Sequence, residues 1–210
     1  ICNLYKIIIK GDNNEEGLVV PFRPNEAQLR FIGRLHHRNI ILKARQLGFT
    51  TLIAIVWLDH ALFNANSRCG IIAQDRESAK VIFRDKVKFA YNNLPDALRS
   101  KFPLAEDNAD ELLFSHNNSS IRVATSMRSG TIHRLHISEF GKICAKFPIK
   151  AKEVVTGSIP AVPLNGITII ESTAEGSEGE FHDMTQRAIV MDQQKKTLTE
   201  RDYRFHFFPW

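Results

Sequence analysis

Cysteine is scarce in this chain of 210 residues, and the sequence contains only Cys2, Cys69 and Cys144. The number is odd, the three residues lie far apart, and no two of them form a C-x-x-C pair. This spacing argues against a disulfide framework and against a zinc site. We therefore expect the protein to function in a reducing compartment.

The sequence also lacks a long hydrophobic run. Its most apolar stretch, residues 52–63, is interrupted by Asp59 and His60 and is too short to span a bilayer. The N-terminus does not have the charged, apolar and cleavage regions of a secretory signal peptide. These absences favour a soluble, cytoplasmic protein without a membrane partner.

Charge of one sign is not concentrated in any long block. The chain has 28 Lys and Arg against 23 Asp and Glu, which gives a formal net charge of +5. A basic balance suits a polyanionic partner, but interspersed charges are only a weak indication of nucleic-acid binding. With 43% hydrophobic residues, the composition is that of an ordinary globular protein, and the length suffices for one sizeable α/β domain.

Short apolar segments alternate with helical patterns, and the sequence has no repeats or low-complexity tracts. The patterns predict strands at residues 39–42, 69–73, 111–114, 120–124, 134–137, 166–170 and 204–207. They predict helices at residues 26–35, 50–63, 76–92, 149–155 and 180–192.

The order of these elements predicts a fold class. Asn117 and Asn118 tolerate the left-handed backbone of a tight turn, so the strands on either side of them should form a hairpin. Elsewhere, strand-helix-strand order implies right-handed crossovers and parallel strands. We expect a three-layer α/β domain with a mainly parallel central sheet and an antiparallel insertion. Functional groups should then collect at the carboxyl ends of the strands.

The segment KARQLGFTT, residues 43–51, resembles a phosphate loop without its lysine. The pattern G-x-x-x-x-G-K-[ST] requires Lys before the hydroxyl residue, but here Gly48 is followed by Phe49 and Thr50. A predicted strand precedes the segment and a long apolar helix follows it, which is the context of a phosphate loop. Backbone amides and the helix dipole favour a bound anion whatever the side chains are.

The missing lysine raises the question of which residue supplies positive charge. We favour Arg45, because it lies inside the loop and its planar guanidinium can engage two phosphate oxygens. Lys43 is the second candidate, since it closes the preceding strand and its side chain can point away. Thr50 is placed to bind Mg²⁺ through its hydroxyl. The alternative is that Arg45 is a solvated turn residue and Thr50 merely a helix cap.

A second motif, RLHISEF at residues 134–140, is a short apolar strand that ends in Ser138 and Glu139. In phosphate-loop ATPases this strand ends in an acid that holds Mg²⁺, and a following Glu polarises the attacking water. Ser138 fits the first role imperfectly, whereas Glu139 fits the second. The alternative is a solvated glutamate at a strand end.

Five segments occur in an order that carries a family resemblance. They are RPNEAQ (23–28), ARQLGFTT (44–51), GIIAQDRESAKVIF (70–83), LHISEFGK (135–142) and IIESTAEG (169–176). Together they resemble the ATPase domain of the large terminase subunit of tailed bacteriophages, a P-loop domain of the RecA/ASCE type that drives DNA packaging. The resemblance implies ATP and Mg²⁺ as cofactors and translocation of double-stranded DNA into a procapsid in the host cytoplasm. It further implies a homo-oligomeric ring, a portal protein and a small terminase subunit as partners.

The resemblance also assigns roles to individual residues. Gln28, in the segment at about 21–30, would recognise adenine; the alternative is that this segment is a helix start with Gln28 on the surface. The residues of the phosphate loop that would bind ATP are Lys43, Arg45, Gln46, Leu47, Gly48, Phe49, Thr50 and Thr51.

By the same resemblance, Thr50 and Ser138 would hold Mg²⁺, and Glu139 would be catalytic. Arg128 would act as an arginine finger on a neighbouring subunit, and the alternative is that it contacts only DNA phosphate or solvent. Ser172 and Thr173, in the segment 169–176, would couple hydrolysis to DNA movement.

Large terminase subunits usually carry a C-terminal nuclease domain, but this chain ends at Trp210, just after the last predicted strand. We expect a single ATPase domain over residues 1–210 without nuclease activity. Two alternatives remain open from the sequence. One is a related DNA helicase or translocase, because the ATPase core is shared. The other is a nucleotide-binding scaffold module with little turnover, which the missing Lys and acid would explain.

Overall fold

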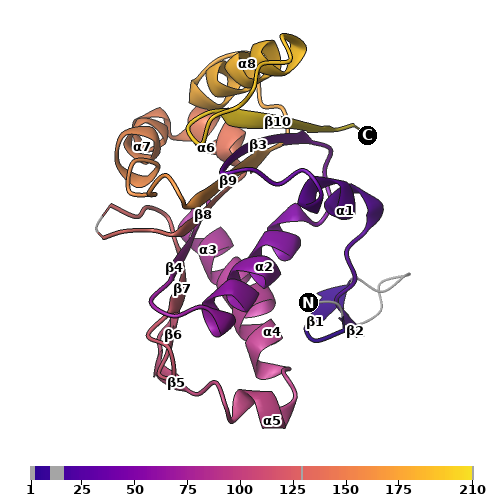
Figure 1. Ribbon diagram of the computed structural model, residues 1–210, viewed down its shortest axis with the longest axis vertical. Helices are drawn as coiled ribbons and strands as arrows, with labels where there is room; N and C mark the ends of the chain where they lie inside the picture. The colour runs from indigo at the N-terminus through magenta and orange to yellow at the C-terminus, as the bar shows by residue number, and fades with distance from the viewer. Residues whose placement is uncertain (1–2, 10–16, 129, 210) are drawn as a thin grey trace.

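An eight-stranded β-sheet runs through the centre of the computed structural model, with helices on both of its faces (Figure 1). The structure describes residues 3–9, 17–128 and 130–209. The strand order across the sheet is β10-β3-β9-β8-β4-β7-β6-β5. The bounds of these strands are β3 (Arg38–Lys43), β4 (Arg68–Ile72), β5 (Leu104–Asp107), β6 (Glu111–Phe114), β7 (Ser120–Ala124), β8 (Arg134–Ser138), β9 (Ile167–Ser172) and β10 (Tyr203–Phe208).

The sheet is parallel over most of its width. Neighbouring strands from β10 across to β7 run parallel, and β6 and β5 add an antiparallel extension at one edge. The predicted hairpin is confirmed as the pair β6 and β7, and Asn118 in its turn has the left-handed φ of 55°. The structure therefore confirms the predicted fold class, a three-layer α/β domain with a mainly parallel sheet.

Two groups of helices form the outer layers (Figure 1). One face of the sheet packs against α2 (Phe49–Phe63) and the segment formed by α3 (Arg76–Ile82), the π-helix η2 (Phe83–Lys88) and α4 (Phe89–Asn92). The other face packs against α6 (Phe140–Lys146), α7 (Pro148–Glu153), the π-helix η3 (Val154–Ser158) and α8 (Glu180–Gln193). No helix in the part of the chain that the structure describes is long and apolar enough to cross a bilayer.

Adjacent residues of the central strands belong to different hydrophobic cores. Ile41 of β3 and Ile169 of β9 pack in the core under α2, whereas Ile40 and Ile170 pack in the core under α6 and α8. The reason is that successive side chains of a strand point to opposite faces of the sheet. The same alternation decides on which side of the sheet each polar residue at a strand end lies.

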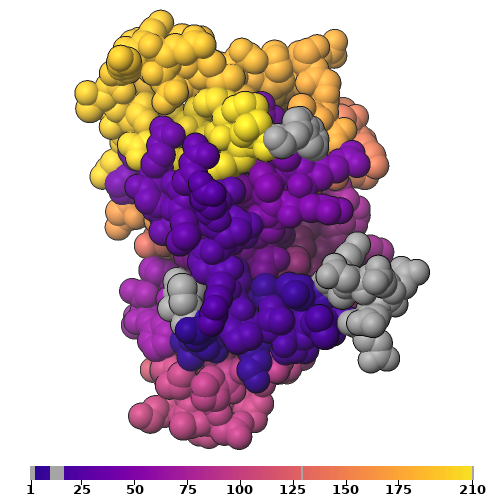
Figure 2. All heavy atoms as spheres, turned by 90° about the vertical axis from the view of Figure 1, so that its right-hand side faces the viewer, coloured from indigo at the N-terminus to yellow at the C-terminus, as the bar shows by residue number. Residues whose placement is uncertain are grey.

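Several short elements were not predicted. A separate two-stranded antiparallel sheet joins β1 (Lys6–Ile9) to β2 (Leu18–Pro21). The prediction also missed β5, α6 and the four-residue helix α5 (Asp96–Arg99), and it extended α1 (Glu26–Ile32) to residue 35. These elements are too short to show a clear period. In Figure 2 the indigo and purple segments from the N-terminal part of the chain cover the surface between the yellow C-terminal segments and the pink segments.

His206 is a buried histidine at the centre of β10. Only 2% of the residue is exposed, its Nε2–H donates to Asn39 Oδ1 at 3.1 Å, and its ring packs edge-on against Phe31. Burial, helped by the nearby charges of Arg34 and Arg204, lowers the pKa of His206 to about 3. The folded protein therefore keeps this ring neutral at mildly acidic pH.

We expect this burial to make the protein acid-sensitive. Between pH 6.5 and about 3 the unfolded chain binds a proton at position 206 that the folded chain does not, so the free energy of unfolding decreases as the pH falls. One such group contributes a slope of at most about 1.4 kcal/mol per pH unit. Urea unfolding between pH 7 and 4 should show a shallower decrease for His206→Gln than for the unsubstituted chain. His182→Gln, at the surface of α8, is the control, and equal slopes in all three proteins would contradict the expectation.

Candidate active site

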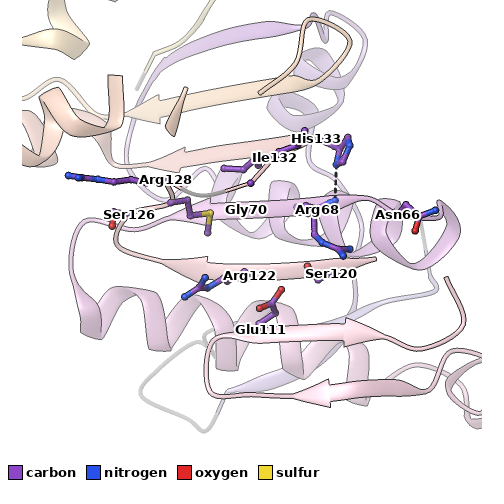
Figure 3. Close-up of a pocket in the computed structure, with 14 residues that line it drawn as sticks. Asn66, Arg68, Gly70, Glu111, Ser120, Arg122, Ser126, Arg128, Ile132 and His133 are labelled. Atoms are coloured by element: carbon purple, nitrogen blue, oxygen red, sulfur yellow. Dashed lines mark hydrogen bonds between the residues drawn. The ribbon is translucent and has the colours of Figure 1, made fainter. Parts of the chain in front are cut away.

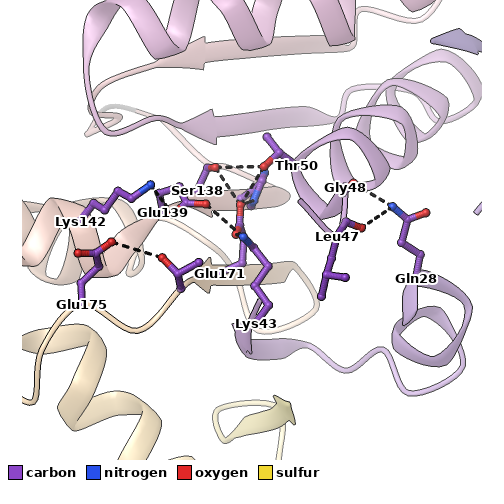
Figure 4. A network of polar contacts seen from close by, with 12 residues as sticks. Gln28, Lys43, Leu47, Gly48, Thr50, Ser138, Glu139, Lys142, Glu171 and Glu175 are labelled. Carbon is purple, nitrogen blue, oxygen red and sulfur yellow. Dashed lines mark hydrogen bonds and ion pairs between the residues drawn. The ribbon is translucent and has the colours of Figure 1, made fainter. Parts of the chain in front are cut away.

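The carboxyl ends of β3, β9 and β8 bring one group of polar side chains together, at the edge of the sheet where the sequence predicts functional residues. Ile41 of β3 pairs with Glu171 of β9, and Glu171 pairs in turn with Ser138 of β8. Since side chains alternate along each strand, Lys43, Glu171 and Ser138 all lie on the face covered by α2. Thr50, at the start of α2, faces them (Figure 4).

Glu171 is the centre of this group, and its side chain is completely buried. Its Oε1 accepts hydrogen bonds from Thr50 Oγ1 at 3.0 Å and from Ser138 Oγ at 2.8 Å. Lys43 Nζ lies 3.1 Å from its Oε2, and His136 Nε2 lies 3.4 Å from its Oε1. Burial raises the pKa of Glu171, but its contacts with His136, Lys43 and Ser138 outweigh this effect and lower the pKa to about 2. The carboxylate is therefore ionised.

Lys43 joins Glu171 to Glu139. Its ammonium donates to Glu139 Oε1 at 3.1 Å, and only 6% of its side chain is exposed. Burial lowers the pKa of Lys43, but Glu171 and Glu139 together raise it above its usual value. The expectation that Lys43 can point away from the site is therefore wrong, because its position on β3 places the side chain on the same face as both glutamates.

Glu139 occupies the turn between β8 and α6. Its backbone is left-handed, with φ 53° and ψ 46°, which costs a non-glycine residue on the order of 1–3 kcal/mol. This turn directs the side chain back toward Lys43 and Lys142, whose Nζ lies 3.1 Å from Glu139 Oε2. Strained backbone of this kind is concentrated at functional sites. The side chain of Glu139 is 23% exposed, but its Oε2 is buried beside Lys142.

The loop between β3 and α2 depends on a glycine at position 48. Gln46 and Gly48 both have positive φ, at 63° and 70°. A Cβ added to Gly48 would lie 2.8 Å from Gln28 Nε2, so the loop requires glycine for its conformation and for space. The loop therefore has the tight shape that can direct backbone N–H groups toward an anion.

Gln28 holds this loop to α1. The residue is buried, and its Nε2 donates to the carbonyl oxygens of Leu47 at 3.1 Å and Gly48 at 3.0 Å. Its Oε1 accepts from the backbone N–H of Asn25, the N-cap of α1. Gln28 is thus buried beside the loop between β3 and α2 rather than on the surface, and its role in adenine recognition stays a prediction. Both of its amide hydrogens are used by the loop, so a contact with adenine requires an exchange of partners.

Phe49 occupies the position of the missing lysine and belongs to the core. It is 1% exposed, and its ring centroid lies 5.7 Å from that of Phe31 and 4.9 Å from that of Phe208. A lysine at position 49 would have to place its charge in this aromatic cluster or leave it. The structure thus gives a packing reason for the departure from the phosphate-loop pattern.

The remaining residues of the loop differ in exposure. Arg45 and Gln46 are exposed, and Leu47 and Thr51 are half-buried. Among the residues that the structure describes, none forms an ion pair with Arg45. Its guanidinium is therefore available to a ligand on the surface of the loop.

The segment after Glu171 contacts α6 rather than the polar side chains that surround Glu171. Ser172 is buried on the opposite face of β9 from Glu171, and a Cβ added to Gly141 of α6 would come within 2.8 Å of its hydroxyl oxygen. Thr173 is also buried, and its Oγ1 donates to Glu175 Oε1 at 3.4 Å. The structure does not bring Ser172 or Thr173 to Lys43 and Thr50.

Glu171 is the site residue that the sequence analysis did not select. A signal was present, because Glu171 follows Ile169 by two residues and therefore shares its face of a buried strand. An acid at the end of such a strand needs a partner. The hydroxyl residues at 172 and 173 follow Glu171 directly and drew the predicted site to themselves.

Arg128 lies apart from this group, in the loop between β7 and β8. Its side chain is 56% exposed and forms an ion pair with Glu153 of α7. It borders a cavity of about 400 Å³ on the sheet, with Arg68, Arg122 and His133, and extends outward from it (Figure 3). Its predicted role as an arginine finger therefore requires a second subunit.

The side chains of Thr50, Ser138 and Glu171 have the chemistry to bind Mg²⁺ together with a phosphate ligand. Within residues 3–9, 17–128 and 130–209, no cluster of three or more His, Cys, Asp or Glu is arranged to hold a metal by itself. Mg²⁺ prefers oxygen ligands and is commonly held by one or two carboxylates, waters and substrate phosphates. Thr50, Ser138 and Glu171 present such oxygens within hydrogen-bond distance of one another. A cavity of about 400 Å³ adjoins them and is lined in part by Thr50, Ser138 and Glu139.

Comparison with known proteins identifies the fold. No protein-family model and no curated protein sequence matches the chain. The crystal structure of the HK97 bacteriophage large terminase is similar with a TM-score of 0.68 and 19% identity, over 89% of this chain and 40% of that one. The Thermus phage P74-26 large terminase ATPase domain is similar with a TM-score of 0.63 and 15% identity, over 89% of this chain and 81% of that one.

A mutant form of the P74-26 domain gives a TM-score of 0.66 with 16% identity, over 90% of this chain and 82% of that one. The present chain thus spans less than half the length of the HK97 protein and most of the length of the isolated P74-26 domain. It has the P-loop fold of the ATPase domains of phage large terminases.

Proposed function

We propose that this chain is a Mg²⁺-dependent ATPase domain that powers the translocation of double-stranded DNA into a procapsid. The observation that carries the proposal is the contact of Thr50 with Glu171, and of Lys43 with Glu139, beside a phosphate-type loop. This arrangement lies at the carboxyl ends of parallel strands, in a fold shared with large terminase ATPase domains. Under this proposal the chain acts in the host cytoplasm.

The phosphates of ATP bind to the backbone N–H groups of residues 44–48 and to the start of α2. These amides and the helix dipole favour an anion without a contribution from position 49. Arg45 supplies most of the side-chain charge, because the charge of Lys43 is already shared by Glu139 and Glu171. Thr50, at the start of α2, would help to hold a Mg²⁺, which would supply positive charge against the phosphates.

Glu139 orients the attacking water and accepts its proton. Its side chain is partly exposed and borders the cavity next to Thr50 and Ser138. Lys43 and Lys142 each contact one of its two oxygens, which fixes the orientation of the carboxylate. A carboxylate positioned in this way can act as a general base.

The partners follow from the same proposal. They are double-stranded DNA, further copies of this chain in a ring, a portal protein and a small terminase subunit.

The contact of Gly141 with Ser172 and Thr173 supports a coupling role for the segment after β9. Glu139 is only two residues before Gly141. A movement of Glu139 can therefore reach Ser172 and Thr173 through the start of α6.

Glu139→Gln keeps the shape of the side chain and removes its negative charge. We expect ATP binding to survive and the steady-state turnover number to fall by ~10² or more, since a positioned general base contributes about this factor. Phosphate release and nucleotide binding should be measured in parallel, with Glu106→Gln at the exposed edge strand β5 as the control. Near-normal turnover in Glu139→Gln would remove Glu139 from the mechanism. An unsubstituted chain that binds ATP but does not hydrolyse it, with DNA present, would favour a scaffold module instead.

Arg45→Ala tests the source of the phosphate-binding charge. We expect the affinity for ATP to fall roughly tenfold or more, because a hydrogen bond to a charged group contributes about 1.5–3 kcal/mol. Arg99→Ala, in the distant helix α5, is the matched control. Lys43→Ala should lose less affinity, measured on protein shown to be folded because the substitution leaves Glu171 without its cation. A larger loss in folded Lys43→Ala than in Arg45→Ala would assign the role to Lys43.

The proposed finger, Arg128, should act between subunits. Neighbours that pack head-to-tail can close into a ring, and Arg128 can then exchange Glu153 for the γ-phosphate on the next subunit. Specific activity should rise with protein concentration. Arg128→Ala should bind ATP normally but turn it over slowly, whereas Arg122→Ala, which borders the same cavity, serves as the control.

Mixing two inactive variants gives a sharper result. In a mixture of Arg128→Ala and Glu139→Gln, some interfaces pair an intact Glu139 with an intact Arg128 from the neighbouring subunit. We expect these interfaces to restore part of the hydrolysis. Absence of recovery in mixtures shown to co-assemble would exclude Arg128 as a finger supplied between subunits.

A further inference from the structure

The strand end at Ser138 lacks a charge that a magnesium site requires. In phosphate-loop ATPases a loop Ser or Thr and an acid at the end of a neighbouring strand hold the ion together. Thr50 satisfies the first requirement, but Ser138 carries a neutral hydroxyl where the acid is expected. The position therefore cannot supply the negative charge of the site by itself.

The neighbouring strand in the sheet, β9, supplies a carboxylate directly opposite Ser138. Glu171 of β9 is the register partner of Ser138, and neighbouring strands lie only about 4.8 Å apart. Its Oε1 accepts from both Thr50 Oγ1 and Ser138 Oγ, at 3.0 and 2.8 Å. An acid at position 138 would have its carboxylate close to the same Thr50 hydroxyl. The negative charge of the site is thus on β9 rather than on the neighbouring strand β8, which carries the acid in phosphate-loop ATPases.

The contacts of Glu171 divide between its two oxygens. Oε2 lies 3.1 Å from Lys43 Nζ, whereas Oε1 points to the two hydroxyls at the edge of the cavity that Thr50 and Ser138 line. A counterion for Lys43 alone would need only the first contact. The second set of contacts joins Glu171 to the hydroxyl expected to bind the metal.

We propose that Glu171 is the carboxylate of the magnesium site, acting with Thr50 and the phosphates of the nucleotide. Ser138 and His136 are positioning residues, since Ser138 donates to the carboxylate and the ring of His136 lies 3.4 Å behind it. This inference rests on the proposed function, because it assumes that the chain binds a nucleotide with Mg²⁺. It goes further by replacing the strand-end acid with a residue from the neighbouring strand.

The test measures metal binding rather than turnover. Mn²⁺ reports on Mg²⁺ sites, and its affinity can be followed by electron paramagnetic resonance in the presence of a non-hydrolysable ATP analogue. We expect Glu171→Gln to weaken Mn²⁺ binding roughly 10- to 100-fold, the usual cost of losing a group that supports a metal site. Affinity for the analogue in EDTA should be retained. Glu175→Gln, which removes a carboxylate from the same segment, is the control.

A second variant restores the acid at its usual place. Glu171→Gln combined with Ser138→Asp should recover Mn²⁺ affinity, because a carboxylate again lies beside Thr50. Recovery is not expected if Glu171 acts only as the counterion of Lys43. If Glu171→Gln does not fold, Glu171→Asp keeps the charge next to Lys43 but withdraws the oxygens by one methylene. It should weaken Mn²⁺ binding and leave metal-free analogue binding intact.

The possible failures can be told apart. Unchanged Mn²⁺ affinity in folded Glu171→Gln would overturn this inference and leave the ATPase proposal standing. An equal loss of analogue affinity with and without metal would also overturn it, since Glu171 would then act through Lys43 alone. If the unsubstituted chain bound the analogue neither with nor without metal, the proposed function itself would fail.

Discussion

The buried carboxylate of Glu171 is the constraint on which the rest of the site depends. It lies inside the sheet with no exposed surface, where an ionised group is stable only when a cation and hydrogen-bond donors surround it. Lys43 provides the cation, and Thr50 and Ser138 provide the donors. Removing one partner of such a pair typically costs about 3–5 kcal/mol. The requirement to satisfy this one carboxylate therefore holds β3, β8, β9 and the start of α2 in a single arrangement.

In the loop between β3 and α2, the positive charges and the buried apolar residue occupy other positions than in the phosphate-loop pattern. Position 49, where the usual pattern has a lysine, carries an aromatic ring packed between Phe31 and Phe208. Positive charge is found instead at Lys43, on the strand, and at Arg45, on the exposed loop. Phe49 thus anchors the start of α2 in the core, and the loop remains free to bind an anion through its backbone.

Helix α6 connects the proposed catalytic residue to the segment after β9. Glu139 adopts a left-handed backbone immediately before the helix, and Gly141 lies so close to Ser172 that any larger residue would collide with it. Because Glu171 and Ser172 are adjacent but face opposite sides of β9, one strand end contacts both the site and this helix. A displacement of β9 or α6 would therefore affect both.

Local sequence patterns determined the strand at residues 39–42, the hairpin turn at Asn118, the loop at residues 44–48 and the position of Glu139 at a strand end. Each depends on residues that are neighbours in the chain, through periodicity, backbone preference or capping. The strand order β3-β9-β8 was decided only by the tertiary structure, and with it the contacts of Glu171 with Lys43 and Thr50. Periodicity specifies which face of its own strand a residue occupies, but long-range pairing decides which strands are adjacent, and in this protein that pairing assembled the site.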